Sequence, residues 1–102
     1  MTEMVRVNEQ EIESRLQSLP SWEFRDGNLV RKFAFADFVT AFSFMTAVAF
    51  IAERMNHHPD WSNVYNTVTI RLSSHEIGGV SENDFTMAAE ISTVYQRYAP
   101  AT

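Results

Sequence analysis

One long apolar run constrains the fold of this chain more than any other feature of its sequence. Residues 38–52, FVTAFSFMTAVAFIA, are apolar except for three hydroxyl-bearing side chains. A membrane-spanning helix needs about 20 predominantly apolar residues, so this run is predicted to be a helix of a soluble domain. The helix is expected to extend from about Asp37 to about Asn56.

The predicted helix carries two apolar stripes. The first comprises Phe38, Phe42, Met45, Ala49 and Ala52, and the second comprises Phe44, Val48, Ile51 and Met55. One stripe is expected to face the domain's own sheet. In a chain of only 102 residues, the other stripe is predicted to pack on a second subunit. A deep groove within the chain is the alternative.

Two hairpins are predicted on either side of this helix. Residues 22–25 and 29–35 are strand-like and flank Asp26–Gly27–Asn28, and Asp-Gly between such runs is a strong hairpin signal. Residues 61–65 and 67–72 form a second pair around one intervening residue. In the last of these runs apolar and polar residues alternate, which predicts one buried and one solvated face.

Helix-start signals lie near both ends of the chain. Asn8 with Glu11, and Ser81 with Asp84, have the spacing of N-terminal capping boxes. The resulting order is α-β-β-α-β-β-α. It predicts an α+β fold, with a four-stranded antiparallel sheet and helices packed on one face. Residues 1–102 are expected to form a single domain.

Composition excludes several classes of function. The chain has no cysteine, which removes thiolate nucleophiles and thiolate metal sites. Its net charge is −5 and no basic stripe is present, so nucleic-acid binding is not expected. The N-terminal residues do not have the pattern of a signal peptide. A cytoplasmic protein without a membrane association is the expectation.

All three histidines lie within nineteen positions, at His57, His58 and His75. Glu53 precedes His57 by four residues, so a shared helix face would let the carboxylate fix the imidazole tautomer. Pro59 cannot continue the helix and restrains His58. If the long helix crosses the sheet, all three rings can open on one cleft. Imidazole, with an ordinary pKa of about 6.5, suits paired acid and base work near neutral pH.

Other interpretations of these residues remain open at this level. His57 could cap the helix C-terminus, or the histidines could bind zinc, although no recognised metal spacing is present. The serines of residues 73–81 lack a nucleophile elbow and are better explained as turn and cap hydroxyls. Asp84 is expected to be a cap that could also line the cleft. Trp22 and Trp61 could be core residues or aromatic walls of a site.

Residues 53–85, ERMNHHPDWSNVYNTVTIRLSSHEIGGVSENDF, resemble the pterin-4a-carbinolamine dehydratase family. The resemblance is carried by a glutamate, His-His-Pro-x-Trp, Asn-Val-Tyr-Asn, Ser-x-His-Glu and Gly-Val-Ser-x-x-Asp. The upstream segments LPSWEF and FADFVTAFSFMTAVAFIAE also match, so the similarity covers nearly the whole chain. Differences at residues 55–56 and 77–80 leave the preferred pterin side chain open.

The resemblance implies an enzyme that removes water from 4a-hydroxytetrahydropterin, giving quinonoid dihydropterin, without a metal or organic cofactor. It implies catalytic roles for His57, His58 and His75. The positions that match the family's substrate-binding site are Glu53, His57, His58, Pro59, Ser74, His75, Glu76, Ile77, Asp84 and Trp22. We expect His57 and His75 to make the main proton transfers, in either order. His58 would position the pterin, and Glu53 would orient His57.

The resemblance also implies partners. Family members are homodimers or homotetramers, and the reaction serves aromatic amino acid hydroxylases such as phenylalanine hydroxylase in tetrahydrobiopterin recycling. Two other functions remain open. One is a non-enzymatic dimerisation cofactor that binds a partner through the long helix, and the other is a dehydratase-like protein of molybdopterin metabolism.

Overall fold

The computed structural model describes residues 5–101 and has the predicted order of elements. These elements are α1 (Glu9–Leu16), β1 (Glu23–Arg25), β2 (Asn28–Ala34), α2 (Phe38–Met55), β3 (Asp60–Val64), β4 (Thr67–Leu72), the 3₁₀ helix η1 (His75–Ile77) and α3 (Glu82–Tyr95). The α+β prediction is therefore confirmed. The short helix η1 is an addition to the predicted order.

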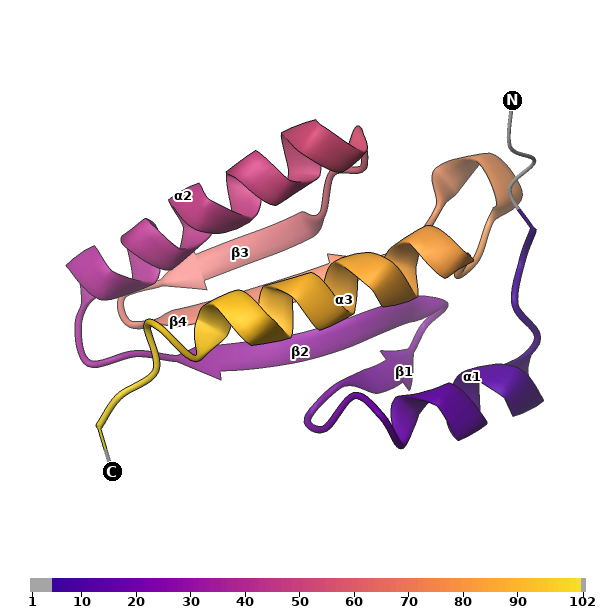
Figure 1. Ribbon diagram of the computed structural model, residues 1–102, viewed down its shortest axis with the longest axis horizontal. Helices are drawn as coiled ribbons and strands as arrows, with labels where there is room; N and C mark the ends of the chain where they lie inside the picture. The colour runs from indigo at the N-terminus through magenta and orange to yellow at the C-terminus, as the bar shows by residue number, and fades with distance from the viewer. Residues whose placement is uncertain (1–4, 102) are drawn as a thin grey trace.

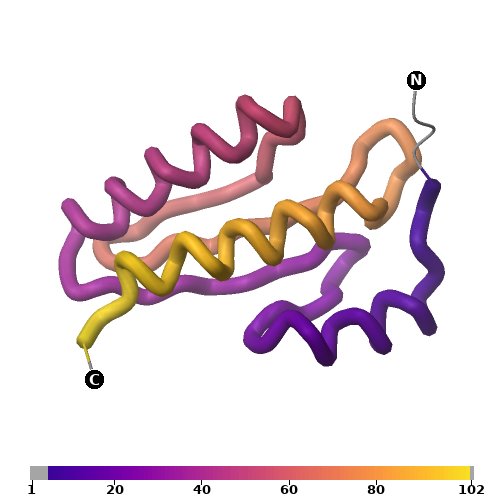
Figure 2. The backbone as a smooth tube through the Cα atoms, in the orientation of Figure 1, coloured from indigo at the N-terminus to yellow at the C-terminus, as the bar shows by residue number. Residues whose placement is uncertain are grey.

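The four strands form one antiparallel sheet in the order β1-β2-β4-β3. Each predicted hairpin is present, and the two hairpins are joined in the middle by pairing of β2 with β4. Helices α2 and α3 lie side by side over one face of the sheet (Figure 1; Figure 2). Helix α1 contacts β1 at one edge. The layer of helices and the sheet enclose the core.

The two hairpins have tight turns with positive φ values, and only the first turn has residues that favour them. Arg25 pairs with Asn28, which leaves Asp26 and Gly27 as a two-residue turn with φ values of 52° and 81°. Positive φ at both positions gives the turn twist that hairpins prefer, and Asp-Gly adopts it readily. In the second hairpin Tyr65 has a φ of 50°, in the left-handed region that few non-glycine residues adopt.

One stripe of α2 packs on the sheet. The Phe44 ring is fully buried, with its centroid 4.9 Å from that of Phe33 and 5.0 Å from that of Phe35. Val48 and Ile51 continue this face. The first stripe is largely uncovered in the single chain, with Phe38 46 % and Phe42 54 % exposed. Ala52, assigned to that stripe from the sequence, is buried and belongs to the core face.

Helix α2 is also long and apolar enough, by length and composition alone, to span a membrane. It has 18 residues and a mean hydropathy of 1.4. At 1.5 Å per residue it is about 27 Å long, slightly less than the roughly 30 Å hydrocarbon core of a bilayer. Its packing on the sheet through one face favours our expectation of a core helix.

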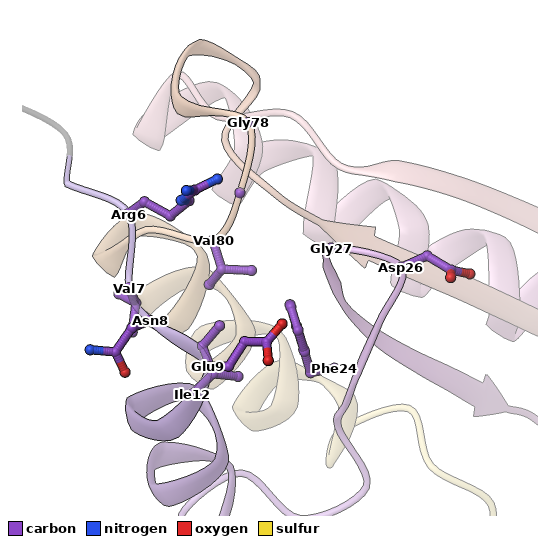
Figure 3. A pocket seen from close by; sticks show the side chains of 11 residues that line it. Arg6, Val7, Asn8, Glu9, Ile12, Phe24, Asp26, Gly27, Gly78 and Val80 are labelled. Atoms are coloured by element: carbon purple, nitrogen blue, oxygen red, sulfur yellow. The ribbon is translucent and has the colours of Figure 1, made fainter.

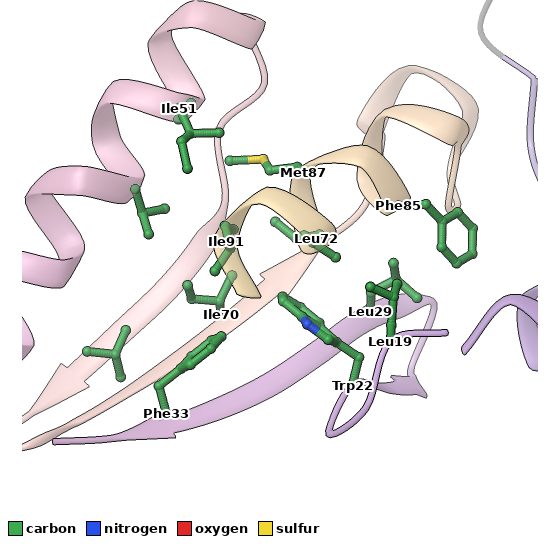
Figure 4. Close-up of a cluster of buried hydrophobic side chains, with 14 of the residues drawn as sticks. Leu19, Trp22, Leu29, Phe33, Ile51, Ile70, Leu72, Phe85, Met87 and Ile91 are labelled. Carbon is green, nitrogen blue, oxygen red and sulfur yellow. The ribbon is translucent and has the colours of Figure 1, made fainter. Parts of the chain in front are cut away.

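Helix α3 completes the core (Figure 4). Phe85, Met87, Ala88 and Ile91 are buried. Ala89, on the other side of the helix, is exposed. The helix meets both the sheet and α2, so its buried surface is wider than a single stripe.

Candidate active site

The three histidines line one pocket at the C-terminal end of α2. The pocket has a volume of about 340 Å³. Its lining residues are Asn56, His57, His58, Pro59, Asp60, Ser73, His75 and Glu76. They come from two connections, one between α2 and β3 and the other between β4 and α3. These connections meet because the start of β3 pairs with the end of β4, where Asp60 is opposite Arg71.

The end of α2 determines where the first two histidines point. Asn56 adopts the left-handed conformation, with φ 50° and ψ 45°, and terminates the helix. The backbone N–H of His57 still donates to the Ala52 carbonyl, at 3.0 Å. The chain then reverses, and Pro59 leads it into β3. His57 and His58 consequently lie outside the helix and face in different directions.

His57 is held by a buried carboxylate from α3. Its side chain is 10 % exposed, and its Nε2 atom lies 2.5 Å from Oδ1 of Asp84, which has no exposed surface. This contact joins the C-terminal end of α2 to the N-terminal end of α3. Asp84 is thus a cap, as expected from the sequence, and it is also the partner of His57, which the sequence did not predict.

Asp84 accepts three further hydrogen bonds at its other oxygen, of which the one from the Ser81 hydroxyl is long, at 3.5 Å. The backbone N–H of Ser81 donates to Oδ2 at 2.8 Å, and the Ser74 hydroxyl donates to Oδ2 at 2.9 Å. The first of these belongs to the predicted capping box, which is present. Because the carboxylate only accepts, the Nε2 atom of His57 carries the proton in this pair. Nδ1 is then the ring nitrogen left for chemistry in the pocket.

Glu53 does not orient His57, contrary to our expectation. Its Oε2 atom lies 2.6 Å from Nε2 of His58. The helical spacing from Glu53 to His57 fails because Asn56 ends the helix one residue before His57. Both partners of the Glu53–His58 pair are largely exposed, at 77 % and 58 % of their side chains, so the pair adds little stability.

His75 is the first residue of η1 and reaches the pocket from the connection between β4 and α3, whereas the other two histidines come from the connection between α2 and β3. Its loop is closed by a bridge between Ser74 and Gly79, and Gly78 adopts a φ of 62° at the end of η1. Of Gly78 and Gly79, only Gly78 has a backbone φ in the left-handed region. Within residues 5–101, no three histidine, aspartate or glutamate side chains are arranged to hold a metal ion.

Comparison with known proteins agrees with this geometry. The family model described as pterin 4 alpha carbinolamine dehydratase matches residues 5–94. The chain belongs to this family. A relative from Solibacter usitatus is 46 % identical over 89 residues, which cover 87 % of this chain and 94 % of the relative. One from Prochlorococcus marinus is 44 % identical over 86 % of this chain and 92 % of its own length. Both provisionally carry the name pterin-4-alpha-carbinolamine dehydratase.

Two solved structures are similar in fold to this pterin carbinolamine dehydratase family member. One is the crystal structure of a transcriptional coactivator/pterin dehydratase from Brucella melitensis, with a TM-score of 0.85 and 39 % identity over 88 % of this chain and 98 % of that one. The other is a pterin dehydratase-like protein that is a RuBisCO assembly factor in the alpha-carboxysome. Its TM-score is 0.59 and its identity 23 % over 72 % of this chain and 84 % of that one, a likeness of fold alone.

Not all of the positions matched to the family's pterin site lie at the histidine pocket. Ser74 and Asp84 are buried directly behind it, through their bond to each other and the bond of Asp84 to His57. Ile77 belongs to η1 but does not line the pocket. Trp22 is 5 % exposed, and its indole N–H donates to Ser92. Figure 4 shows it among the side chains of the core. It does not line the histidine pocket of the single chain.

The site residues named from the sequence omit three residues that line the pocket: Asn56, Asp60 and Ser73. The signal for Asn56 was available, because asparagine is common where a helix ends in the left-handed conformation. Asp60 carries no local signal, and Ser73 had one only as the first residue of the Ser-x-His-Glu motif. They reach the pocket only through the pairing of β3 with β4.

A roomier hollow of about 740 Å³ lies elsewhere, between the segment before α1, the β1–β2 turn and the loop after η1 (Figure 3). Arg6 lies against Gly79 in this hollow, so that a Cβ atom at position 79 would come within 2.4 Å of the Arg6 side chain. No histidine lines it. The segment before α1 holds the loop after η1 in place, through the bond from the Val7 N–H to the Val80 carbonyl. Acid and base chemistry by histidine is therefore assigned to the smaller pocket.

Proposed function

We propose that the protein dehydrates 4a-hydroxytetrahydropterin to quinonoid dihydropterin. The observation that supports this most is the meeting of His57, His58 and His75 at one pocket of about 340 Å³. That volume is within the usual range for small-molecule sites, which begins at about 300 Å³. Membership of the pterin carbinolamine dehydratase family supports the choice of substrate.

The reaction needs one proton delivered and one removed. The bond from C4a to the hydroxyl oxygen breaks, and the leaving oxygen takes a proton to become water. The proton on N5 is removed, and its electron pair forms the C4a–N5 double bond. Both transfers suit imidazoles, which act as general acids and bases near neutral pH. No electron acceptor is needed.

We assign the base to His57 and the acid to His75. Asp84 accepts a hydrogen bond from the protonated Nε2 of His57. The lone pair of Nδ1 is therefore free to take the proton from N5. His75 is exposed, lines the same pocket and can deliver a proton to the leaving hydroxyl. His58, held by Glu53, would position the pterin and assist. Pro59 and Glu76 would contact the substrate, and Asp84 acts through His57 as a positioning residue.

The test is a direct assay of dehydration. Enzymatically generated 4a-hydroxytetrahydropterin is offered to the wild-type protein, His57→Ala, His75→Ala and the exposed α3 control Thr86→Ala, and quinonoid dihydropterin is followed by absorbance. Wild type and control should accelerate the reaction equally, with and without a metal chelator. Each histidine variant should be slower by roughly 10²- to 10⁴-fold. Unchanged turnover in both histidine variants would refute the assignment.

A second candidate function is partner binding through α2. Phe38, Val39, Phe42 and Phe50 are between 46 % and 73 % exposed on this helix in the single chain. We propose that this face forms a homodimer or homotetramer, since exposed apolar patches commonly mark interfaces. The similar Brucella protein is described as a transcriptional coactivator/pterin dehydratase, and this description supports a second candidate role in which α2 binds a partner protein. Sedimentation of wild type and Phe42→Ser would decide whether this face associates.

A further inference from the structure

Arg31 is a cation on the face of β2 that builds the core. Its neighbours on that face, Leu29 and Phe33, are buried, and Ile70 opposite it on β4 is buried as well. Side chains two positions apart in a strand share a face, so Arg31 interrupts an apolar row. Placing a charge there carries a desolvation cost unless the charge is compensated.

The surroundings compensate the Arg31 guanidinium only in part. Its Cζ atom lies 4.5 Å from the ring centroid of Phe33 and 5.1 Å from that of Tyr95, and Nη1 donates to the Ser92 hydroxyl at 3.1 Å. Within residues 5–101, Arg31 takes part in no ion pair, and its buried Nε has no hydrogen-bond partner. Burial lowers the pKa of this guanidinium, and Tyr95 opposes that shift.

The guanidinium opens into a hollow of about 450 Å³ between α3 and the loop before β1. The hollow is lined by Ser18, Leu19, Pro20, Ser21, Arg31, Ala89, Ser92, Thr93, Tyr95, Gln96 and Ala99. None of these residues is an aspartate or glutamate, although the chain has a net charge of −5. Ser21 has a φ of 75°, and backbone strain of this kind often accompanies a functional site.

Two hydrogen-bond donors converge at this hollow. The Ser92 oxygen already accepts from the Trp22 indole N–H at 2.8 Å and from Arg31 Nη1 at 3.1 Å. Two incoming N–H groups occupy both lone pairs of that oxygen, so its hydroxyl proton is left to donate. The Nη2 group of Arg31 is the second donor. A guanidinium fork beside a hydroxyl donor is suited to a planar oxyanion.

We propose that the Arg31 hollow binds a small organic monocarboxylate with an apolar body. A single lining cation matches one negative charge better than the double charge of a phosphate. Leu19, Pro20, Ala89 and Tyr95 give the rest of the ligand an apolar wall. The hollow shares no lining residue with the histidine pocket, so this site does not depend on dehydratase activity.

The protein contains a built-in reporter of this site. Trp22 donates its indole N–H to Ser92, whereas Trp61 lies on β3. In a ¹H–¹⁵N spectrum of the full chain, titration with benzoate should move the Trp22 indole signal saturably and leave the Trp61 signal in place. Benzamide, which has the same shape without the charge, should not do so. Sodium chloride at equal ionic strength controls for screening.

Variants then test the donor. Arg31→Met should weaken benzoate binding by about 10-fold or more, the factor expected for a lost charge-assisted hydrogen bond. Arg25→Met removes the same charge from an exposed strand position and should bind as wild type. If Arg31→Met does not fold, Arg31→Lys and Ser92→Ala should each weaken binding several-fold. The proposal would be overturned if benzoate did not bind saturably, or if benzamide bound equally well. It would also be overturned if both methionine variants lost the same affinity, or if only inorganic phosphate bound.

Discussion

Replacing Asp84 by asparagine tests the central contact of the proposed active site. The amide oxygen can take the place of Oδ2, where it accepts from the Ser81 N–H and the Ser74 hydroxyl. The amide NH₂ group then faces His57. Two donors cannot bond, so His57 must move its proton from Nε2 to Nδ1. The Nδ1 lone pair that we assign to proton removal is lost, and turnover should fall by roughly 10²- to 10⁴-fold.

The same substitution should also lower stability. Hydrogen bonds to a charged acceptor contribute about 1.5–3 kcal/mol each, against about 1 kcal/mol for neutral ones. With three close donors on this buried carboxylate, the loss should be about 2–3 kcal/mol. For a domain of this size that corresponds to roughly 10–20 °C in Tm. Glu53→Gln is the matched control, because its pair with His58 is exposed and should change Tm little.

The decisive measurement is the tautomer of His57, read from the ¹⁵N shifts of its two ring nitrogens in wild type and Asp84→Asn. We expect the proton on Nε2 in wild type and on Nδ1 in the variant. Full dehydratase turnover in a variant whose tautomer has changed would refute the assignment of Nδ1 as the base. An unchanged tautomer would refute the role given to Asp84.

Three further predictions follow from the fold. Phe44→Ala should cost about 3–5 kcal/mol in urea unfolding because the ring is fully buried, while Phe42→Ala should cost less than about 1 kcal/mol in a monomer. Gly78→Ala should be destabilising by about 1 kcal/mol because of its φ of 62°, and comparable stability would contradict that interpretation. Hydrogen bonds from the side chain and backbone of Thr40 lower the pKa of Asp37, so its folded pKa lies below its unfolded one. The resulting stability is present above the ordinary carboxyl pKa and is lost as pH falls through the folded value. The Tm difference between wild type and Asp37→Asn should shrink over that acidic range.

The proposed active site depends on a chain of contacts that joins α2, α3 and the loop of η1. Asp84 at the start of α3 holds His57 at the end of α2, and Ser74 connects both to the loop that carries His75. A change at one of these positions should therefore affect the others, since residues in one hydrogen-bond network do not contribute additively. The exposed Glu53–His58 pair is less coupled to this network.

The sequence by itself determined the order of elements and the kind of chemistry. Asp26–Gly27 predicted its hairpin and Ser81–Asp84 predicted the start of α3, because turn and cap preferences act within a few residues. Only the tertiary structure decided which carboxylate serves which histidine. The left-handed turn at Asn56 separates His57 from Glu53, and the approach of α3 supplies Asp84 in its place.

The same limit applies to the sheet and to Trp22. Pairing of β2 with β4 brings together strands that are 33 or more residues apart in sequence, and no local pattern specifies it. Trp22 could have been a wall or a core residue by composition, and the bond to Ser92, 70 positions away, fixes it in the core. Periodicity, turns and caps are short-range and readable along the chain. The partners of buried polar groups are long-range, because folding chooses them from all the donors and acceptors brought to one place.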